Sequence, residues 1–286
     1  MIHLHEFLLK ILANITRFLF DELNLFNPKN FHNYLSDLPF EILANIAKFL
    51  TSRDILNLSI CCKYLHNLPF AVKFNDPIDI QDIFRLPYYD SFVNVTCNNM
   101  NNIDHDTLFP KSLQVLRWYH KYNRLPRFPD TLLDLELGNY DYYPLLNLPN
   151  SLTYLSLGNS YAHSLPQLPN SLKCLTLGEF YNQPLPQLPD SLLILQLGNS
   201  YNQPLPQLPD SLVVLRLGCK YSQSLPQLPA QLEDLIVADH FDVVPTNLPP
   251  NVHVQRYDCP HSVQVRIFAI RTIYDLDGLG PYRYSN

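Results

Sequence analysis

Apolar positions recur with a fixed spacing over the second half of the chain. The residues YNQPLPQLPDSL stand at 181–192 and again at 201–212, 20 positions apart. A leucine-proline pair marks the same register in six successive units: Leu148, Leu168, Leu188, Leu208, Leu228 and Leu248. Weaker units begin at Phe128 and Phe109, which gives eight units over residues 109–257. A period of about 20 residues predicts a solenoid, in which each repeat is one supersecondary unit stacked on the next.

Each unit contains a short alternating segment that predicts a strand. In the first complete unit, Leu155 and Leu157 fall on one side of this segment, and Tyr154 and Ser156 fall on the other. Neighbouring strands are expected to pair as a parallel ladder about 4.8 Å apart. Five of the seven glycines end these segments at the same frame position. This placement indicates either a positive φ or a close approach of two backbones.

The return path of each unit contains the sequence LPQLP, with prolines three residues apart. Proline fixes φ and removes a hydrogen-bond donor, so this segment favours polyproline II over a helix. Leu165 and Leu168 then fall on one face and point back at the strand leucines. Each unit is therefore predicted to be a flat coil with its leucines inside.

The outward strand positions vary while the leucine frame stays fixed, which is how a solenoid builds a binding surface. The positions predicted to contact a target protein are Asp134, Glu136, Tyr154, Ile194, Gln196, Val214 and Arg216. The alternative is that sequence drift is simply tolerated on a solvated face.

Upstream of the array, residues 35–75 follow a helical spacing of apolar positions. Asp37 or Ser36 is suited to cap a helix with Pro39 in its first turn. Thr51 and Asp54 form a capping-box pattern for a second helix. Residues 76–108 are expected to be a linker and N-terminal cap of the array, and residues 258–286 a C-terminal cap. In the latter, Ser262–Ile270 alternates like a strand and is expected to cover the open end.

Composition narrows the class of protein. Apolar residues make up 47% of the 286 and charged residues 16%, which is typical of a folded chain. The net charge of −6 and the lack of a basic run argue against nucleic acid as a partner. The apolar stretch at 7–20 is interrupted by Lys10 and Arg17, and neither a signal peptide nor a membrane span is expected.

The sequence offers little catalytic chemistry. The six cysteines form no CxxC pair and are expected to be buried, reduced thiols of an intracellular protein. The ten histidines form no ligand cluster, so neither a metal nor another cofactor is expected. Asp258 and Cys259 follow the array, as a catalytic cysteine would in a bacterial repeat-containing ubiquitin ligase. The 27 residues after Cys259 are too few for a catalytic domain, so no enzymatic activity is expected.

The array resembles FNIP repeats, a short relative of leucine-rich repeats, because the leucine frame, the glycine and the YNQPL segment recur in register. The segment LPFEILANI and the later CCKYL resemble an F-box. These resemblances imply an α+β multidomain chain: an α-helical F-box, then a leucine-rich-repeat-like solenoid of strands and polyproline segments. Residues 1–34 share ILANI and further positions with the F-box segment and are interpreted as a degenerate duplicate of it.

The F-box resemblance implies docking onto a Skp-type adaptor and, through it, a cullin. The residues it would place in that interface are Leu38, Pro39, Glu41, Ile42, Leu43, Ile46, Cys62 and Lys63. The expected function is that of a substrate receptor in a cytoplasmic ubiquitin ligase, or in the host cytoplasm for a viral protein. The alternative is a scaffold or decoy that binds a partner without ubiquitylation.

Overall fold

The computed structural model describes residues 40–47, 50–61, 67–98, 109–119, 127–139, 144–241 and 248–259. Its helices are α3 (Phe40–Ala47), α4 (Ser52–Cys61), α5 (Leu68–Ala71), α6 (Ile80–Ile83) and the 3-10 turn η3 (Tyr89–Ser91). Its strands are β1 (Ile78–Asp79), β2 (Asn94–Cys97), β3 (Val115–Trp118), β4 (Asp134–Leu137), β5 (Tyr154–Ser156), β6 (Cys174–Thr176), β7 (Ile194–Gln196), β8 (Val214–Arg216), β9 (Asp234–Ala238) and β10 (His253–Tyr257).

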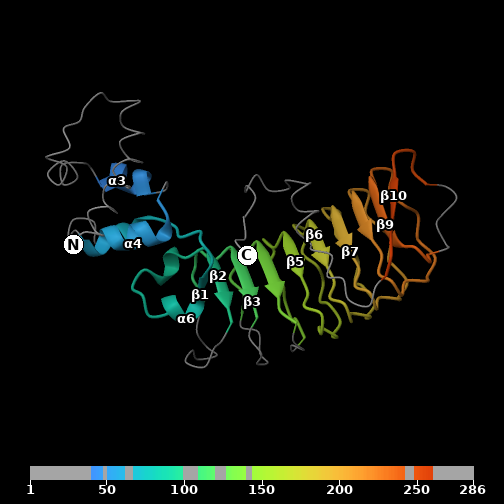
Figure 1. Ribbon diagram of the computed structural model, residues 1–286, viewed down its shortest axis with the longest axis horizontal. Coiled ribbons are helices and arrows are strands. Elements are labelled where there is room, and N and C mark those ends of the chain that lie inside the picture. The colour runs from blue at the N-terminus through green and yellow to red at the C-terminus, as the bar shows by residue number, and fades with distance from the viewer. Residues whose placement is uncertain are drawn as a thin grey trace.

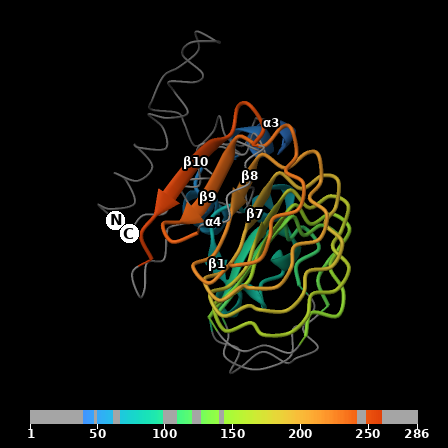
Figure 2. The same ribbon diagram turned by 90° about the vertical axis from the view of Figure 1, so that its right-hand side faces the viewer.

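The described strands form a single parallel sheet in chain order, from β1 to β10. Figure 1 shows them side by side along the molecule, with the helices gathered at the β1 end. Viewed from the other end, the strands stack along one side and the return segments along the other (Figure 2). Each of the eight 20-residue units contributes one strand, β3 to β10. The region expected to be a linker and cap adds β1 and β2 to the same sheet.

The leucines of the repeat form the core, as the alternation predicts. Leu155, Leu175, Leu195 and Leu215 lie in register in β5 to β8 and are fully buried. Leu165 and Leu168 of the return segment are buried in the same cluster. Return segments such as residues 162–169 contain neither helix nor strand. Parallel stacking of identical coils therefore buries the side chains that one coil alone would leave exposed.

A hydrogen-bonded turn explains the recurring sequence LP-x-SL. The N–H of Leu192 donates to the carbonyl of Pro189 (3.0 Å), which closes a turn just before β7. The hydroxyl of Ser191 inside this turn donates to the carbonyl of Leu172 (2.8 Å) in the preceding unit. The same bond to a leucine of the preceding unit is made by Thr131, Ser151, Ser171 and Ser211. The serine hydroxyl thus gives a hydrogen-bond partner to a backbone carbonyl of the preceding coil.

The recurring glycine allows two backbones to approach closely. A Cβ atom built on Gly178 would stand 2.0 Å from the carbonyl oxygen of Gly158 in the preceding unit. No side chain fits at that distance, so the close approach accounts for the glycine.

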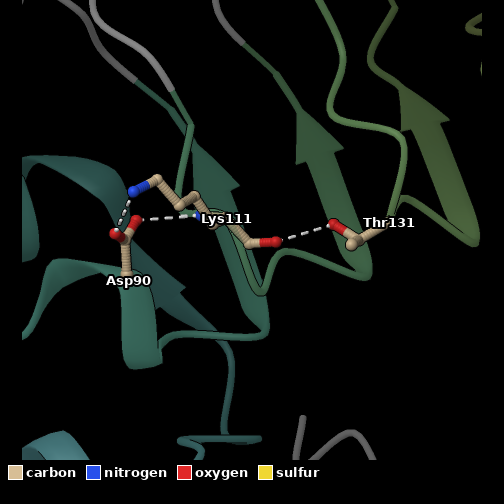
Figure 3. Close-up of polar contacts among 3 residues, drawn as sticks. All are labelled: Asp90, Lys111 and Thr131. Atoms are coloured by element: carbon tan, nitrogen blue, oxygen red, sulfur yellow. Dashed lines mark hydrogen bonds and ion pairs between the residues drawn. The ribbon is translucent and has the colours of Figure 1, made fainter.

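The 3-10 turn η3 connects the N-terminal cap to the array (Figure 3). Asp90 in η3 accepts a hydrogen bond from the N–H of Lys111 (2.9 Å) and lies 3.5 Å from its ammonium group. The carbonyl of Lys111 accepts in turn from the hydroxyl of Thr131 (3.0 Å) in the next unit. Among the described residues, no helix is long and apolar enough to cross a membrane.

Candidate protein-binding surfaces

Two parts of the molecule are candidates for binding other proteins: the helices α3 and α4, and the outward face of the sheet, here called the strand face. Within the described ranges, no three histidine, cysteine or acidic side chains are grouped so as to hold a metal ion.

The helix α4 begins at the predicted capping box. The N–H of Asp54 donates to the hydroxyl oxygen of Thr51 (3.2 Å), and that hydroxyl donates to the Asp54 carboxylate (2.8 Å). Ile55 and Ser59 form the buried side of α4, and Leu43 and Ala47 that of α3. Reciprocal capping and one apolar face are what a short helix needs in order to form against a neighbour.

The residues predicted to contact an adaptor are only partly described. Glu41 is exposed in the first turn of α3. Ile42 and Ile46 lie in α3, but the positions of their side chains are outside the description. The predictions for Leu38, Pro39, Cys62 and Lys63 also lie outside the described residues. Leu43 is buried in the chain's own core (4% exposed) and offers no surface to an adaptor, which corrects its assignment to the interface.

The short helix α5 lies between α4 and the solenoid in the chain. It packs against α3, α4 and η3. Just beyond it, Phe74 is buried and stacks on Phe92, with ring centroids 4.7 Å apart. One hydrophobic cluster runs without interruption from Leu43 in α3 to Phe241 after β9. The helices and the repeats therefore share a core and are not separated by an exposed linker.

The strand face is not the open surface that the sequence predicts. Its central strands carry an apolar row, formed by Tyr154, Cys174, Ile194 and Val214 in β5 to β8. These side chains are only 1–8% exposed. Gln196, predicted to be solvent-facing, is 6% exposed. The prediction that these positions face solvent is therefore wrong.

A polar cluster lies on the strand face at its β2 to β4 end. The guanidinium of Arg117 donates to the side-chain oxygen of Asn94 (3.1 Å) and lies 3.5 Å from the carboxylate of Glu136. The hydroxyl of Tyr119 donates to the same carboxylate (2.7 Å). Burial and the neighbouring Glu136 raise the pKa of Tyr119. Asn94, Arg117 and Asp134 are buried, whereas Glu136 and Tyr119 are half-buried.

The other end of the strand face is built around Arg216. Its guanidinium carbon lies 4.7 Å from the ring centroid of Tyr257 in β10. The Tyr257 hydroxyl donates to the carbonyl of Leu217 (2.8 Å), so this ring reaches back over β9 towards β8. Burial raises the pKa of Tyr257, and the adjacent Arg216 offsets part of that rise. Arg216 is half-buried in this contact, and a target would meet only part of its side chain.

Two features were missed by the sequence reasoning. The first is a stack of tyrosines in the coil interior, formed by Tyr161, Tyr181, Tyr201 and Tyr221. Successive ring centroids are 6.3 Å apart and the planes are within 12° of parallel. The signal was present, because a tyrosine opens every YNQP-type segment at the 20-residue period.

The second missed feature is a disulfide between Cys219, just after β8, and Cys259, just after β10. It corrects the expectation that the cysteines are reduced thiols. Cys97 and Cys174 do fit that expectation, since both are buried and neither belongs to a disulfide. Spacing alone could not reveal the pair, because the two residues are 40 positions apart and meet only through the coil geometry.

Models of known protein families match both the helical segment and the repeat array. The F-box domain model matches residues 35–75, and the FNIP repeat model matches residues 144–180 and 181–220. Together with the parallel sheet, these matches define a leucine-rich-repeat-like β-solenoid preceded by a helical module. The chain contains an F-box domain at residues 35–75 and two FNIP repeats at residues 144–220.

Among solved structures, the chain is similar to CroV588, described as a novel circular LRR protein structure. The sequences are 28% identical with a TM-score of 0.52, over 58% of this chain and 27% of that one. It is also similar to YopM from Yersinia enterocolitica WA-314, at 23% identity and a TM-score of 0.43, over 59% of this chain and 48% of that one. The chain thus spans about a quarter of CroV588 and about half of YopM. No curated protein matches significantly.

The F-box indicates an adaptor role of the kind found in SCF-type ligases, and the solenoid suggests protein binding. Both modules are typical of non-enzymatic adaptor or interaction proteins.

Proposed function

We propose that the protein is a non-catalytic substrate receptor of an SCF-type ubiquitin ligase. In this proposal the F-box docks onto a Skp-type adaptor and, through it, a cullin. The FNIP solenoid holds a target protein. The role is exercised in the cytoplasm, where the ligase core and its target meet.

The shared core between the F-box helices and the solenoid carries this proposal. A receptor accelerates ubiquitin transfer by holding a target near the loaded enzyme, which is an effect of proximity and orientation. Such an effect requires that the two binding modules do not move freely. The packing of α5 on α3, α4 and η3 supplies this restraint, since the same side chains belong to the cores of both modules.

Adaptor binding tests the proposal directly. We expect the full-length protein to co-purify with a Skp-type adaptor, and Leu38→Ala combined with Pro39→Ala to weaken binding at least about tenfold, because a few apolar anchors carry most of an interface's affinity. The measurement is the dissociation constant by calorimetry. The control is Gln207→Ala with Asp210→Ala, which removes two exposed side chains of the array.

Equal binding by the double variant and the parent would remove the F-box docking assignment. Adaptor binding without ubiquitylation of any bound target would instead favour the scaffold or decoy function.

A further inference from the structure

The Cys219–Cys259 disulfide lies where a small molecule can reach it. Both cysteines are half-buried, in the segments that follow β8 and β10. Cys97 and Cys174 lie within strands and are buried, with exposed fractions of 0% and 8%. A thiol in solution can therefore exchange with the disulfide, whereas the fold shields these two strand cysteines.

The disulfide holds an end of the sheet that buries little of its surface. Every residue of β7, in the centre of the array, is buried, whereas no residue of β10 is. His253, Gln255 and Arg256 are exposed, and Val254 and Tyr257 are half-buried. Burial of apolar surface supplies most of the free energy that holds an element in place. The strand β10 therefore belongs to the weakly held part of the described sheet.

The side-chain bonds of β10 lie in contact with solvent. The amide of Gln255 donates to the carboxylate of Asp234 (3.2 Å), and the guanidinium of Arg256 donates to the carbonyl of Asp239 (2.8 Å). Both bonds are exposed, so water competes for the same groups. Such contacts restrain β10 only weakly.

The disulfide adds a restraint of a different kind. Cys219 and Cys259 are 40 positions apart in the chain, and a crosslink of this span removes much of the conformational freedom that the segment would gain on release. The bond also lies beside Tyr257, whose hydroxyl oxygen is 3.8 Å from the sulfur of Cys219. Breaking it therefore acts directly on the residue whose ring covers Arg216.

We propose that the Cys219–Cys259 pair is a redox-sensitive switch for the C-terminal end of the array. In the disulfide form, β10 stays docked on β9 and the ring of Tyr257 stays over the guanidinium of Arg216. In the dithiol form, β10 is released for a larger fraction of the time, which uncovers Arg216 and the outer edge of β9. The end of the array thus presents a different surface to a partner in each form.

The reductant is a low-molecular-weight monothiol of the glutathione class. Its thiolate attacks one sulfur of the disulfide, forms a mixed disulfide and releases the other cysteine, which takes up a proton. A second monothiol attacks the mixed disulfide and releases the remaining cysteine as a thiol. The protein pair gains two electrons and two protons, and two monothiols become one disulfide. Excess oxidised monothiol drives the same steps in reverse and docks β10 again.

A glutathione titration of the full-length protein tests the switch. The protein is equilibrated in buffers that run from excess glutathione disulfide to excess glutathione, and alkylation with peptide mass spectrometry gives the fraction of the pair in the dithiol form. Parallel samples receive a short pulse of trypsin, and the cut after Arg256 in β10 is quantified. Cleavage requires local release of the strand, so its rate follows the released population.

We expect the pair to pass from disulfide to dithiol within this range. The cut after Arg256 should become at least about tenfold faster with the same midpoint, because the crosslink no longer restrains the segment. The cut after Lys173, next to β6, should keep its rate. A reduced sample returned to excess glutathione disulfide should regain slow cleavage. The variant with Cys219→Ser and Cys259→Ser should be cut after Arg256 at the fast rate in every buffer.

A pair that stays oxidised in excess glutathione would overturn the switch, as would a cut after Arg256 that does not respond to reduction. Equal acceleration after Arg256 and Lys173 would show that the whole array opens, which overturns a local device. Redox dependence that persists in the double serine variant would assign the effect to other cysteines and overturn the proposal too.

If the double serine variant fails to fold, the parent still decides, because its reduction and reoxidation need no substitution. These readouts are independent of adaptor binding, so a failure here is distinct from a failure of the proposed function.

Discussion

At the scale of single residues, the recurring leucine, serine, glycine and tyrosine of the repeat each make a specific packing or hydrogen-bonding contact. The strand leucines fill the interior of the coil, and the serine hydroxyl donates a hydrogen bond to a carbonyl of the preceding coil. The glycine leaves room for the backbone of the preceding coil to approach closely. The tyrosine carries a hydroxyl into the interior and stacks on its neighbours. Such positions tolerate few substitutions, whereas the exposed positions of the return segment, such as Gln207, have no such task.

Replacing Leu197 with Ala should lower the free energy of unfolding by about 2–5 kcal/mol, because a buried leucine leaves a cavity. Gln207→Ala, at an exposed position, should change it by no more than about 0.5 kcal/mol. Urea titration of both variants measures the difference. Similar losses at the two positions would contradict the assignment of the coil interior.

The tyrosine stack should make stability depend on alkaline pH. Burial raises the pKa of Tyr181 and Tyr221 from 10.0 to about 12, and N–H groups of Leu165 and Leu205 offset part of the rise. The unfolded chain releases these protons first, so the stabilisation is complete below pH 10.0 and is lost as the pH rises towards about 12.

The variant with Tyr181→Phe and Tyr221→Phe should therefore lose less stability than the parent over that range. Urea midpoints measured from about pH 9 to about pH 11 give the comparison. Parallel pH profiles for parent and variant would contradict it.

At the scale of elements, the end of the array differs from its centre. Strands β5 to β8 each have a neighbour of nearly identical sequence on both sides, whereas β10 is paired on one side only among the described strands. The Cys219–Cys259 disulfide, the Tyr257 hydroxyl and the Arg216 contact all fasten β10 back to β8. They offset the lack of a second neighbouring strand.

Cys219→Ser should loosen β9 and β10 by about 2–4 kcal/mol, because the lost crosslink no longer restrains the unfolded segment. Hydrogen exchange at Leu235 and Val254 should accelerate, while exchange at Leu175 in β6 stays unchanged. Cys259→Ser, or reduction of the parent, should give the same pattern. Equally accelerated hydrogen exchange across β5 to β10 would contradict a disulfide that stabilises β9 and β10 alone. In a reducing cytoplasm the pair would exist as thiols, so this end would be looser there.

At the scale of the whole molecule, one continuous core joins the helices and the solenoid. The joint is aromatic: Phe74 stacks on Phe92, and Phe70 meets Tyr88 edge-on with ring centroids 5.8 Å apart. Of the two phenylalanines, Phe74 is buried and Phe70 is 52% exposed. The relative orientation of the helices α3 and α4 and the solenoid therefore depends on Phe74.

Phe74→Ala should cost about 3–5 kcal/mol and uncouple the two modules, because it removes a buried ring from the joint. Phe70→Ala should cost about 1 kcal/mol and leave the shape unchanged, since that ring has only an edge contact to lose. Small-angle X-ray scattering measures the shape, and a broadened distance distribution is expected for Phe74→Ala alone. An unchanged distribution in a destabilised Phe74 variant would show that the modules are coupled elsewhere.

The sequence by itself determined the period, the strands and which leucines are inside. This is because alternation and a fixed repeat constrain every coil through its immediate neighbours in the chain. The residues Leu155 and Leu157, the capping pair Thr51 and Asp54, and the glycine were all identified from such local patterns. The F-box was recognised in the same way, from a contiguous segment.

Only the tertiary structure decided which outward positions remain accessible and which cysteines pair. Ile194 and Gln196 occupy outward strand positions in the sequence pattern, yet both are buried. Cys219 and Cys259 carry no spacing signal, yet two coils bring them together. Burial on the far side of a sheet and contact across coils depend on segments distant in the chain. Alternation specifies the side of a strand on which a residue lies, and the packing of the rest of the molecule decides whether that side is exposed.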